Sequence, residues 1–140
     1  MTPEPSVEPM VDWTSFSAAR AELGASFVRI LGYFQEDGVK SVAAIEEAMR
    51  ARNAAAMVIP AHTLKGEARQ FGAERLAAIA ETIEMIARNC VETRDEPTEL
   101  LEPVVKLRPM FTATLEMLER EANPLVPRRA GGFGKRQALG

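Results

Sequence analysis

Apolar residues recur every three or four positions over several long stretches of this 140-residue chain. Such spacing turns one side of an α-helix toward a core, whereas a half-buried strand would alternate apolar and polar residues. Alanine is abundant and runs of β-branched residues are scarce, which also favours helix. We therefore predict an all-α protein. The longest series keeps one helical face apolar over about 25 residues; it comprises Phe27, Ile30, Leu31, Phe34, Val42, Ile45 and Met49.

The first part of the chain predicts a short helix and the start of a long one. The short helix covers residues 14–23, and Gly24 is suited to end it. Trp13 or Phe16 is expected to anchor this helix in the core. Ser26 is then a suitable N-cap for the long amphipathic helix that follows.

The long second helix is expected to end near Arg52 and Asn53, because cations favour the C-terminal end of a helix. Gly32 and Gly38 each weaken it by about 1 kcal/mol relative to alanine. A bend near Gly38 is therefore expected. Asn53 can cap the next helix, which is predicted over residues 54–70.

Pro60 lies inside this third helix. Proline cannot donate to the carbonyl of Ala56, and its ring clashes with that carbonyl unless the helix kinks. The sequence leaves three outcomes open: a distorted first turn, a regular helix that begins nearer Ile59, or a change in the direction of the chain beside His62.

Two more helices are predicted after Gly72, which permits a tight reversal. The fourth helix covers residues 73–89, and residues 91–97 form a polar connection. Pro103 and Pro109 predict a late start or a kink in the last helix. The apolar face of that helix is formed by Leu100, Val104, Leu107, Phe111, Leu115 and Leu118.

Long amphipathic helices joined by short turns pack as antiparallel bundles. We predict an antiparallel up-and-down four-helix bundle with a short additional N-terminal helix, at residues 13–122. A chain of 140 residues fits one domain. Residues 1–12 are expected to be a disordered lead and residues 123–140 a flexible basic tail.

Charge and composition argue against several functions. The formal net charge of −3 disfavours nucleic-acid binding by the whole domain, although the tail is basic. The start of the chain lacks the apolar segment of a secretory signal. The longest apolar run, residues 54–61, is far shorter than the roughly 20 residues that span a bilayer. Cys90 is the only cysteine, so no internal disulfide or cysteine cluster can form. We expect a soluble, cytoplasmic protein without a metal site.

The third helix carries a polar stripe around the single histidine of the chain. His62, Lys65, Gly66 and Arg69 follow one another at helical spacing and lie within about 50–60° of one line. The opposite side of this helix is apolar and is expected to face the core; it includes Met57, Leu64 and Phe71. A titratable ring, two cations and a residue without a side chain share the outward stripe, which indicates a functional site.

These residues resemble a known signature. The run Ala61-His62-x-Leu64-Lys65-Gly66, followed by Gly72, Leu76 and Ile83-Glu84, is similar to the motif of histidine-containing phosphotransfer (HPt) domains. These domains are relay proteins of multistep two-component signalling. The resemblance covers most of the chain. It implies that His62 takes a phosphoryl group from an aspartate of one receiver domain and passes it to another.

The resemblance and the chemistry assign roles to the neighbours of His62. Lys65 provides a mobile charge that stabilises the phosphoryl group, and Gly66 leaves steric access to the ring. Glu84 occupies the place of the residue that orients the imidazole through Nδ1, which would leave Nε2 as the nucleophile. A plainer alternative is a rim carboxylate that pairs with Arg88, four residues on. Arg69 is a candidate phosphate or docking contact.

The expected partners are receiver domains and a hybrid or cognate histidine kinase. Val58, Ile59, Arg69 and Gln70 are candidate docking residues around His62. The chain has no room for the ATP-binding domain of a kinase, so it would be a phosphotransfer intermediate without turnover of its own. No cofactor is expected, and Mg²⁺ should come with the receiver. The resemblance favours a monomer. The net charge and the short apolar runs predict that it binds neither nucleic acid nor membrane.

Two other functions stay open. The main alternative is a helical adaptor that binds a receiver or another signalling protein without accepting phosphate. A nucleic-acid-binding bundle that uses residues 128–136 would show strongly salt-dependent binding, lost on truncation at Asn123.

Overall fold

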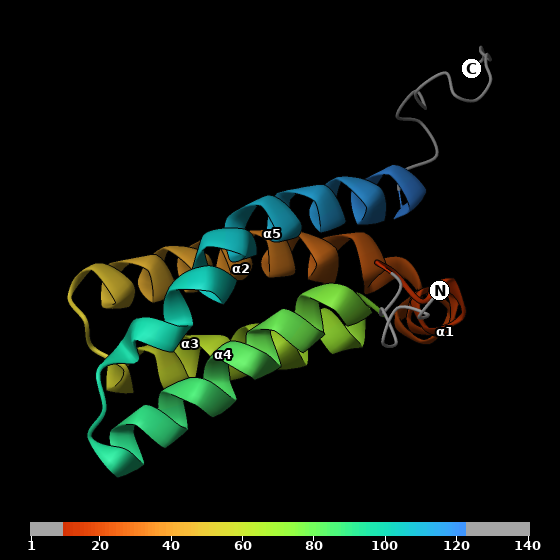
Figure 1. The fold of residues 1–140 in the computed structure, drawn as a ribbon. Helices are drawn as coiled ribbons and strands as arrows, with labels where there is room; N and C mark the ends of the chain where they lie inside the picture. Colours follow the sequence, from red (N-terminus) through yellow and green to blue (C-terminus); the bar gives the residue numbers. More distant parts are fainter. Residues whose placement is uncertain (1–9, 123–140) are drawn as a thin grey trace, which may run out of the picture.

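The computed structural model describes residues 10–122, which are helical apart from turns and short connections. The helices are α1 (Trp13–Leu23), α2 (Phe27–Arg50), α3 (Ala55–Gln70), α4 (Glu74–Thr93) and α5 (Leu101–Ala122), with short 3₁₀ turns at Gly24–Ser26 and Pro97–Leu100 (Figure 1). The tail predicted at 123–140 and residues 1–9 of the predicted lead lie outside the described residues.

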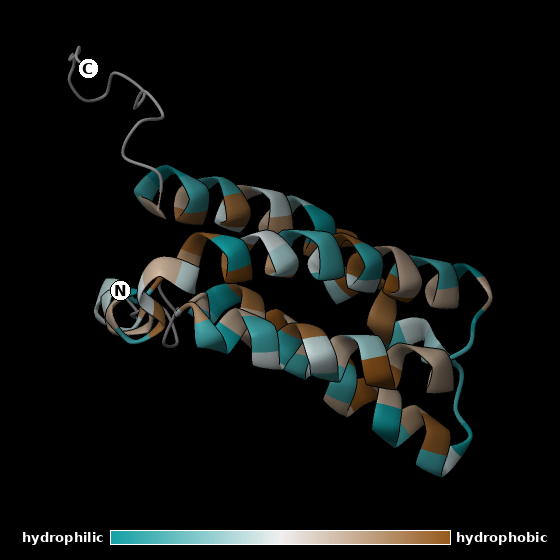
Figure 2. Cartoon of the chain, turned by 180° about the vertical axis from the view of Figure 1, so that it is seen from behind, coloured by the Kyte–Doolittle hydropathy of each residue, from teal (hydrophilic) through white to brown (hydrophobic). Residues whose placement is uncertain are grey.

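The four long helices form the antiparallel bundle that the sequence predicted. They run alternately in opposite directions, and α1 lies across one end of the bundle (Figure 1). Each long helix packs against the next one in the chain, and α5 closes the arrangement against α2. Teal and brown patches follow one another along the long helices in Figure 2, as expected for helices with one side in the core and one in water.

A connected series of phenylalanine rings in the core joins α1, α2 and α5 with Phe71, the residue directly after α3. Phe16 of α1 meets Phe27 edge-on, with 5.3 Å between ring centroids, and Phe27 meets Phe71 at 5.7 Å. Phe34 contacts both Phe71 (5.4 Å) and Phe111 of α5 (5.8 Å). The residues assigned to the core side of the third helix, Met57, Leu64 and Phe71, are all buried.

The start of the fold lies slightly earlier than predicted. Val11 is buried, and the Asp12 side chain accepts hydrogen bonds from the amides of Thr14 and Ser15 at the start of α1. The Asp12 amide donates to the carbonyl of Gly72 (2.7 Å), which fastens this end to the turn before α4. Val11 and Asp12 therefore belong to the fold and not to the lead.

The helix α1 ends at Gly24 as predicted, and of the two candidate anchors Phe16 is the buried one; Trp13 is 39% exposed. Ser26 does not cap α2 with its side chain, which is a correction. Its backbone is already helical (φ −83°, ψ −8°), because the 3₁₀ turn leads directly into α2. The Ser26 hydroxyl accepts instead from Arg29 (3.1 Å).

Asn53 Oδ1 accepts from the amide of Ala56 at 3.1 Å, the type of bond expected of a cap, although the residue directly before α3 is Ala54. The helix runs unbroken from Ala55, so a start near Ile59 is wrong, and Pro60 is accommodated inside it. Gly72 adopts the left-handed conformation (φ 75°) that the reversal requires. This left-handed turn brings α4 back alongside α3.

The helix α4 extends to Thr93, four residues past its predicted end, so the connection to α5 is shorter than expected. The next residue, Arg94, has a left-handed backbone (φ 60°) that ends the helix, and its amide donates to the carbonyl of Cys90. Leu100 falls in the 3₁₀ turn and α5 starts just after it. Pro103 lies in the first turn of α5, whereas Pro109 is inside the helix.

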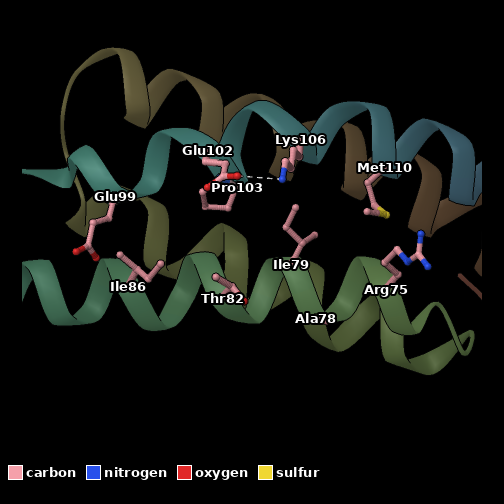
Figure 3. Close-up of a pocket in the computed structure, with 10 residues that line it drawn as sticks. All are labelled: Arg75, Ala78, Ile79, Thr82, Ile86, Glu99, Glu102, Pro103, Lys106 and Met110. Carbon is pink, nitrogen blue, oxygen red and sulfur yellow. Dashed lines mark hydrogen bonds and ion pairs between the residues drawn. The ribbon is translucent and has the colours of Figure 1, made fainter. Parts of the chain in front are cut away.

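A groove of about 480 Å³ lies between α4 and α5 (Figure 3). Ile79, Ile86 and Met110 give it an apolar floor, and charged side chains such as Arg75 and Glu99 lie along it. It contains no residue of the polar stripe on α3. The groove is therefore separate from the candidate site.

Candidate phosphotransfer site

The polar stripe of α3 faces outward as predicted. The His62 side chain is 60% exposed, while Ala61 and Leu64 on the other side of the helix are fully buried. Gly66 is exposed, and a Cβ built on it would meet no atom within 4 Å. The histidine therefore stands on an open surface beside a position without a side chain.

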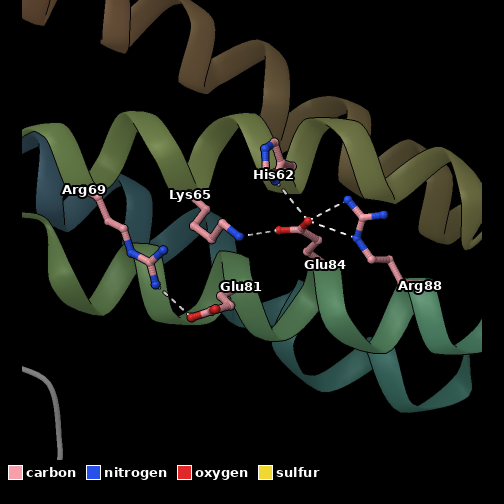
Figure 4. A network of polar contacts seen from close by, with 6 residues as sticks. All are labelled: His62, Lys65, Arg69, Glu81, Glu84 and Arg88. Atoms are coloured by element: carbon pink, nitrogen blue, oxygen red, sulfur yellow. Dashed lines mark hydrogen bonds and ion pairs between the residues drawn. The ribbon is translucent and has the colours of Figure 1, made fainter.

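Glu84 of α4 reaches across to this stripe and is the centre of the network in Figure 4. His62 Nδ1 lies 3.0 Å from Glu84 Oε2, and Lys65 Nζ lies 2.9 Å from Oε1. The Glu84 side chain is only 6% exposed, although it is charged. A carboxylate this close accepts the Nδ1 hydrogen, so the other ring nitrogen, Nε2, is free to act as a nucleophile.

A further cation completes the network from α4 itself. Arg88, one turn after Glu84, donates from Nε (3.0 Å) and Nη2 (2.8 Å) to the same Oε2 that binds His62. The ion pair between Glu84 and Arg88, which the sequence analysis gave as an alternative role for Glu84, is therefore present. This ion pair occurs together with the contact to His62. Glu84 is buried, so the alternative of a carboxylate at the exposed edge of the helix is wrong.

The charge of Glu84 is maintained by its partners. Burial alone would raise the pKa of this carboxyl, but the ion pair with Lys65 and the hydrogen bonds from Arg88 and His62 outweigh burial. Together they lower the pKa from 4.5 to about 2. Glu84 is thus ionised at neutral pH, and the site combines one carboxylate with two basic side chains and a histidine.

Arg69 is not part of this network. It lies on the same stripe, but its Nη2 pairs with Glu81 of α4 at 2.8 Å (Figure 4). Gln70, at the last position of α3, is exposed. The structure thus brings together His62, Lys65 and Glu84, and places Arg69 and Gln70 farther along the helix.

Two apolar residues, Val58 and Ile59, lie about one helical turn before His62 on α3. Ile59 is 71% exposed, and Val58 is half-buried at the edge of the core. A shallow groove of about 460 Å³ lies beside Val58 and is lined by Ala55, Val58, Arg88, Val91 and Glu92. Sequence reasoning missed Val91, an exposed residue of the last turns of α4, because the helix was predicted to end before it.

No group of three or more His, Cys, Asp or Glu residues within 10–122 is placed to hold a metal ion. In the same part of the chain, no helix is both long and apolar enough to cross a membrane.

The chain matches the family described as the Hpt domain over residues 29–123. Because this match covers more than half of the sequence, the chain belongs to the Hpt domain family, whose members carry phosphoryl groups on histidine in phosphorelays. The helix α1 precedes the matched region.

A solved structure has the same fold. It is the crystal structure of histidine-containing phosphotransfer protein B (HptB) from Pseudomonas aeruginosa PAO1, which superposes with a TM-score of 0.71 at 20% sequence identity. The match covers 82% of this chain and 96% of that one. No curated protein sequence is significantly similar to this chain.

Proposed function

We propose that His62 is the phospho-acceptor of this Hpt protein, relaying a phosphoryl group between aspartates of receiver domains. The observation that carries the proposal is the geometry of the ring. The imidazole is 60% exposed, and its Nδ1 is engaged by a buried carboxylate. An exposed nucleophilic nitrogen with an oriented partner nitrogen is what a protein-to-protein transfer needs.

The proposed step involves one bond made and one broken. The lone pair of His62 Nε2 attacks the phosphorus of the receiver's aspartyl phosphate, and the P–O bond to that aspartate breaks. The aspartate leaves as a carboxylate, and the ring, which keeps its Nδ1 hydrogen, becomes a phosphorylated imidazolium. Glu84 stabilises this new positive charge at 3.0 Å. A carboxylate of the second receiver reverses the sequence.

Lys65 supplies the charge for the transferred group. The transition state of phosphoryl transfer spreads negative charge over three oxygens, so nearby cations lower its energy. Lys65 lies one turn from His62 on the same stripe. Gly66 is proposed to leave room for the receiver's active site, and Mg²⁺ is expected on the receiver.

The receiver is proposed to dock over the apolar surface formed by Val58, Ile59 and Val91. Val58 and Ile59 lie four and three residues before His62 on α3, Val91 shares a groove with Val58, and the polar side chain of Glu92 lines the same groove. Such a combination is common in transient protein interfaces. We propose a cytoplasmic monomer that exchanges phosphate with receivers and a histidine kinase and has no turnover of its own.

The direct test mixes the protein with a phosphorylated receiver domain and follows the label. The wild-type chain should acquire a phosphoryl group that is labile to acid and stable to base, and His62→Gln should acquire none. His62→Gln should still bind the receiver, because the docking residues are unchanged. If His62→Gln keeps all of the label, the assignment of His62 is wrong. If the wild-type chain binds receivers but never takes label, the adaptor alternative is correct.

A further inference from the structure

We propose that Arg88 is a positioning residue, which holds Glu84 against His62 while Lys65 leaves Glu84 for the phosphoryl group. The inference rests on the proposed role of His62 and begins with the position of Lys65. Its Nζ lies 2.9 Å from Glu84 Oε1, and its side chain is only 18% exposed. An ammonium group held there points at the carboxylate, on the Nδ1 side of the ring. Lys65 therefore has to move in order to contact a phosphoryl group on Nε2.

Movement of Lys65 would remove one of the cations that compensate Glu84. The Glu84 side chain is 6% exposed, and a buried charge that loses its partner is strongly destabilised. Arg88 continues to compensate the charge of Glu84 after Lys65 has moved. Its two hydrogen bonds go to Oε2, whereas Lys65 contacts Oε1. The carboxylate can thus stay ionised and paired after Lys65 leaves.

Arg88 also determines which oxygen faces the ring. Its planar guanidinium donates twice to Oε2, a fixed geometry that a lysine cannot reproduce. The same oxygen accepts from His62 Nδ1, so Arg88 and His62 hold it from two sides (Figure 4). Rotation of the carboxylate would break all three bonds at once. The Nδ1–H form of the ring is thereby favoured.

The position of Arg88 is consistent with this role. It is 58% exposed, so it is not needed to fill the core. It follows Glu84 by four residues on α4, the favourable order for an acidic and a basic residue on one helix. Arg88 also lines the shallow groove beside Val58. The test therefore has to separate positioning of the ring from docking of the receiver.

The experiment compares Arg88→Gln and Arg88→Lys with the wild-type chain, using a phosphorylated receiver over a range of concentrations. Positioning predicts that Arg88→Gln lowers the saturating transfer rate by about tenfold, with less than a twofold change in the half-saturating receiver concentration. Arg88→Lys should restore part of the rate. A change confined to the half-saturating concentration would assign Arg88 to docking and overturn the proposal.

A second readout needs no transfer. His62 is the only histidine in the chain, so ¹⁵N NMR of labelled imidazole reports its tautomer directly. Arg88→Gln should lower the population of the Nδ1–H form. Lys106→Gln, which removes a similar i,i+4 pair with Glu102, is the matched control and should behave as wild type. An Arg88→Gln protein with wild-type rate and tautomer refutes the inference, whereas a wild-type chain that takes no label refutes the proposed function.

Discussion

At the scale of single residues, Glu84 is a buried side chain that contacts the exposed histidine of the candidate site. It is a buried charge that contacts three donors on two helices, and one of these donors is the exposed histidine. The free energy of folding and the orientation of the ring therefore depend on the same carboxylate. Changes at Glu84 should affect both.

Glu84→Gln should alter how stability depends on pH. The folded pKa of Glu84 is lowered to about 2 from 4.5, so its stabilising contribution is present above pH 4.5 and is lost as the pH falls through about 2. A shift of this size corresponds to about 3 kcal/mol. Urea unfolding between pH 6 and pH 2.5 should show the wild-type protein losing more stability than Glu84→Gln. Glu102→Gln, at an exposed pair, is the control and should follow the wild type. Parallel curves for wild type and Glu84→Gln would contradict the prediction.

Gly66 allows access to the histidine to be separated from stability. Its Cβ position is open, so Gly66→Ala should stabilise α3 by up to about 1 kcal/mol. Gly66→Phe should fold as well but cover the approach to His62, and should slow transfer from a receiver by at least about tenfold if Gly66 serves access.

The matched controls for Gly66 are Gly32→Ala and Gly32→Phe on α2, where the Cβ position is equally open. They should leave the transfer rate unchanged. Thermal unfolding and single-turnover transfer provide the two measurements. A Gly66→Phe protein that transfers at the wild-type rate would show that the space above Gly66 is not used.

At the scale of elements, the two glycines inside α2 play different roles although the sequence pattern treats them alike. Gly32 contacts nothing at its Cβ position, so it only weakens the helix. At Gly38 a Cβ would lie 2.4 Å from Cε1 of Phe111, a core residue of α5. Gly38 therefore lets α2 and α5 approach closely around that ring.

Substitution of these glycines should change stability in opposite directions. Gly38→Ala should destabilise the fold by about 1–3 kcal/mol, because the buried ring of Phe111 has to shift. Gly32→Ala should stabilise it by up to about 1 kcal/mol. Urea unfolding of the two variants measures both effects. Equal stabilisation by both substitutions would mean that Gly38 is not a packing position.

At the scale of the whole molecule, the bundle holds the network around Glu84 between α3 and α4, and the surface proposed for docking includes residues of the same two helices. The Hpt match begins at residue 29, yet α1 is integrated into the fold through Phe16 and through the bond between Asp12 and Gly72. This bond ties α1 to the turn that joins α3 to α4. The two helices that carry the network are thus fixed at that end.

The sequence by itself determined the helices, the bundle and the outward stripe with His62 and Lys65, because helical periodicity is a local property of the chain. It also led to Glu84 through the family motif. The left-handed turn at Gly72 and the cap at Asn53 were predictable for the same local reason.

Only the tertiary structure decided how far Glu84 is buried and that Arg88 and His62 share one of its oxygens. It also decided that Arg69 pairs with Glu81, that Val91 is an exposed residue of α4, and that Gly38 accommodates Phe111. Each of these facts depends on the distance and rotation between two helices. Packing of the core sets this distance and rotation, and the spacing of residues along a single helix cannot predict them.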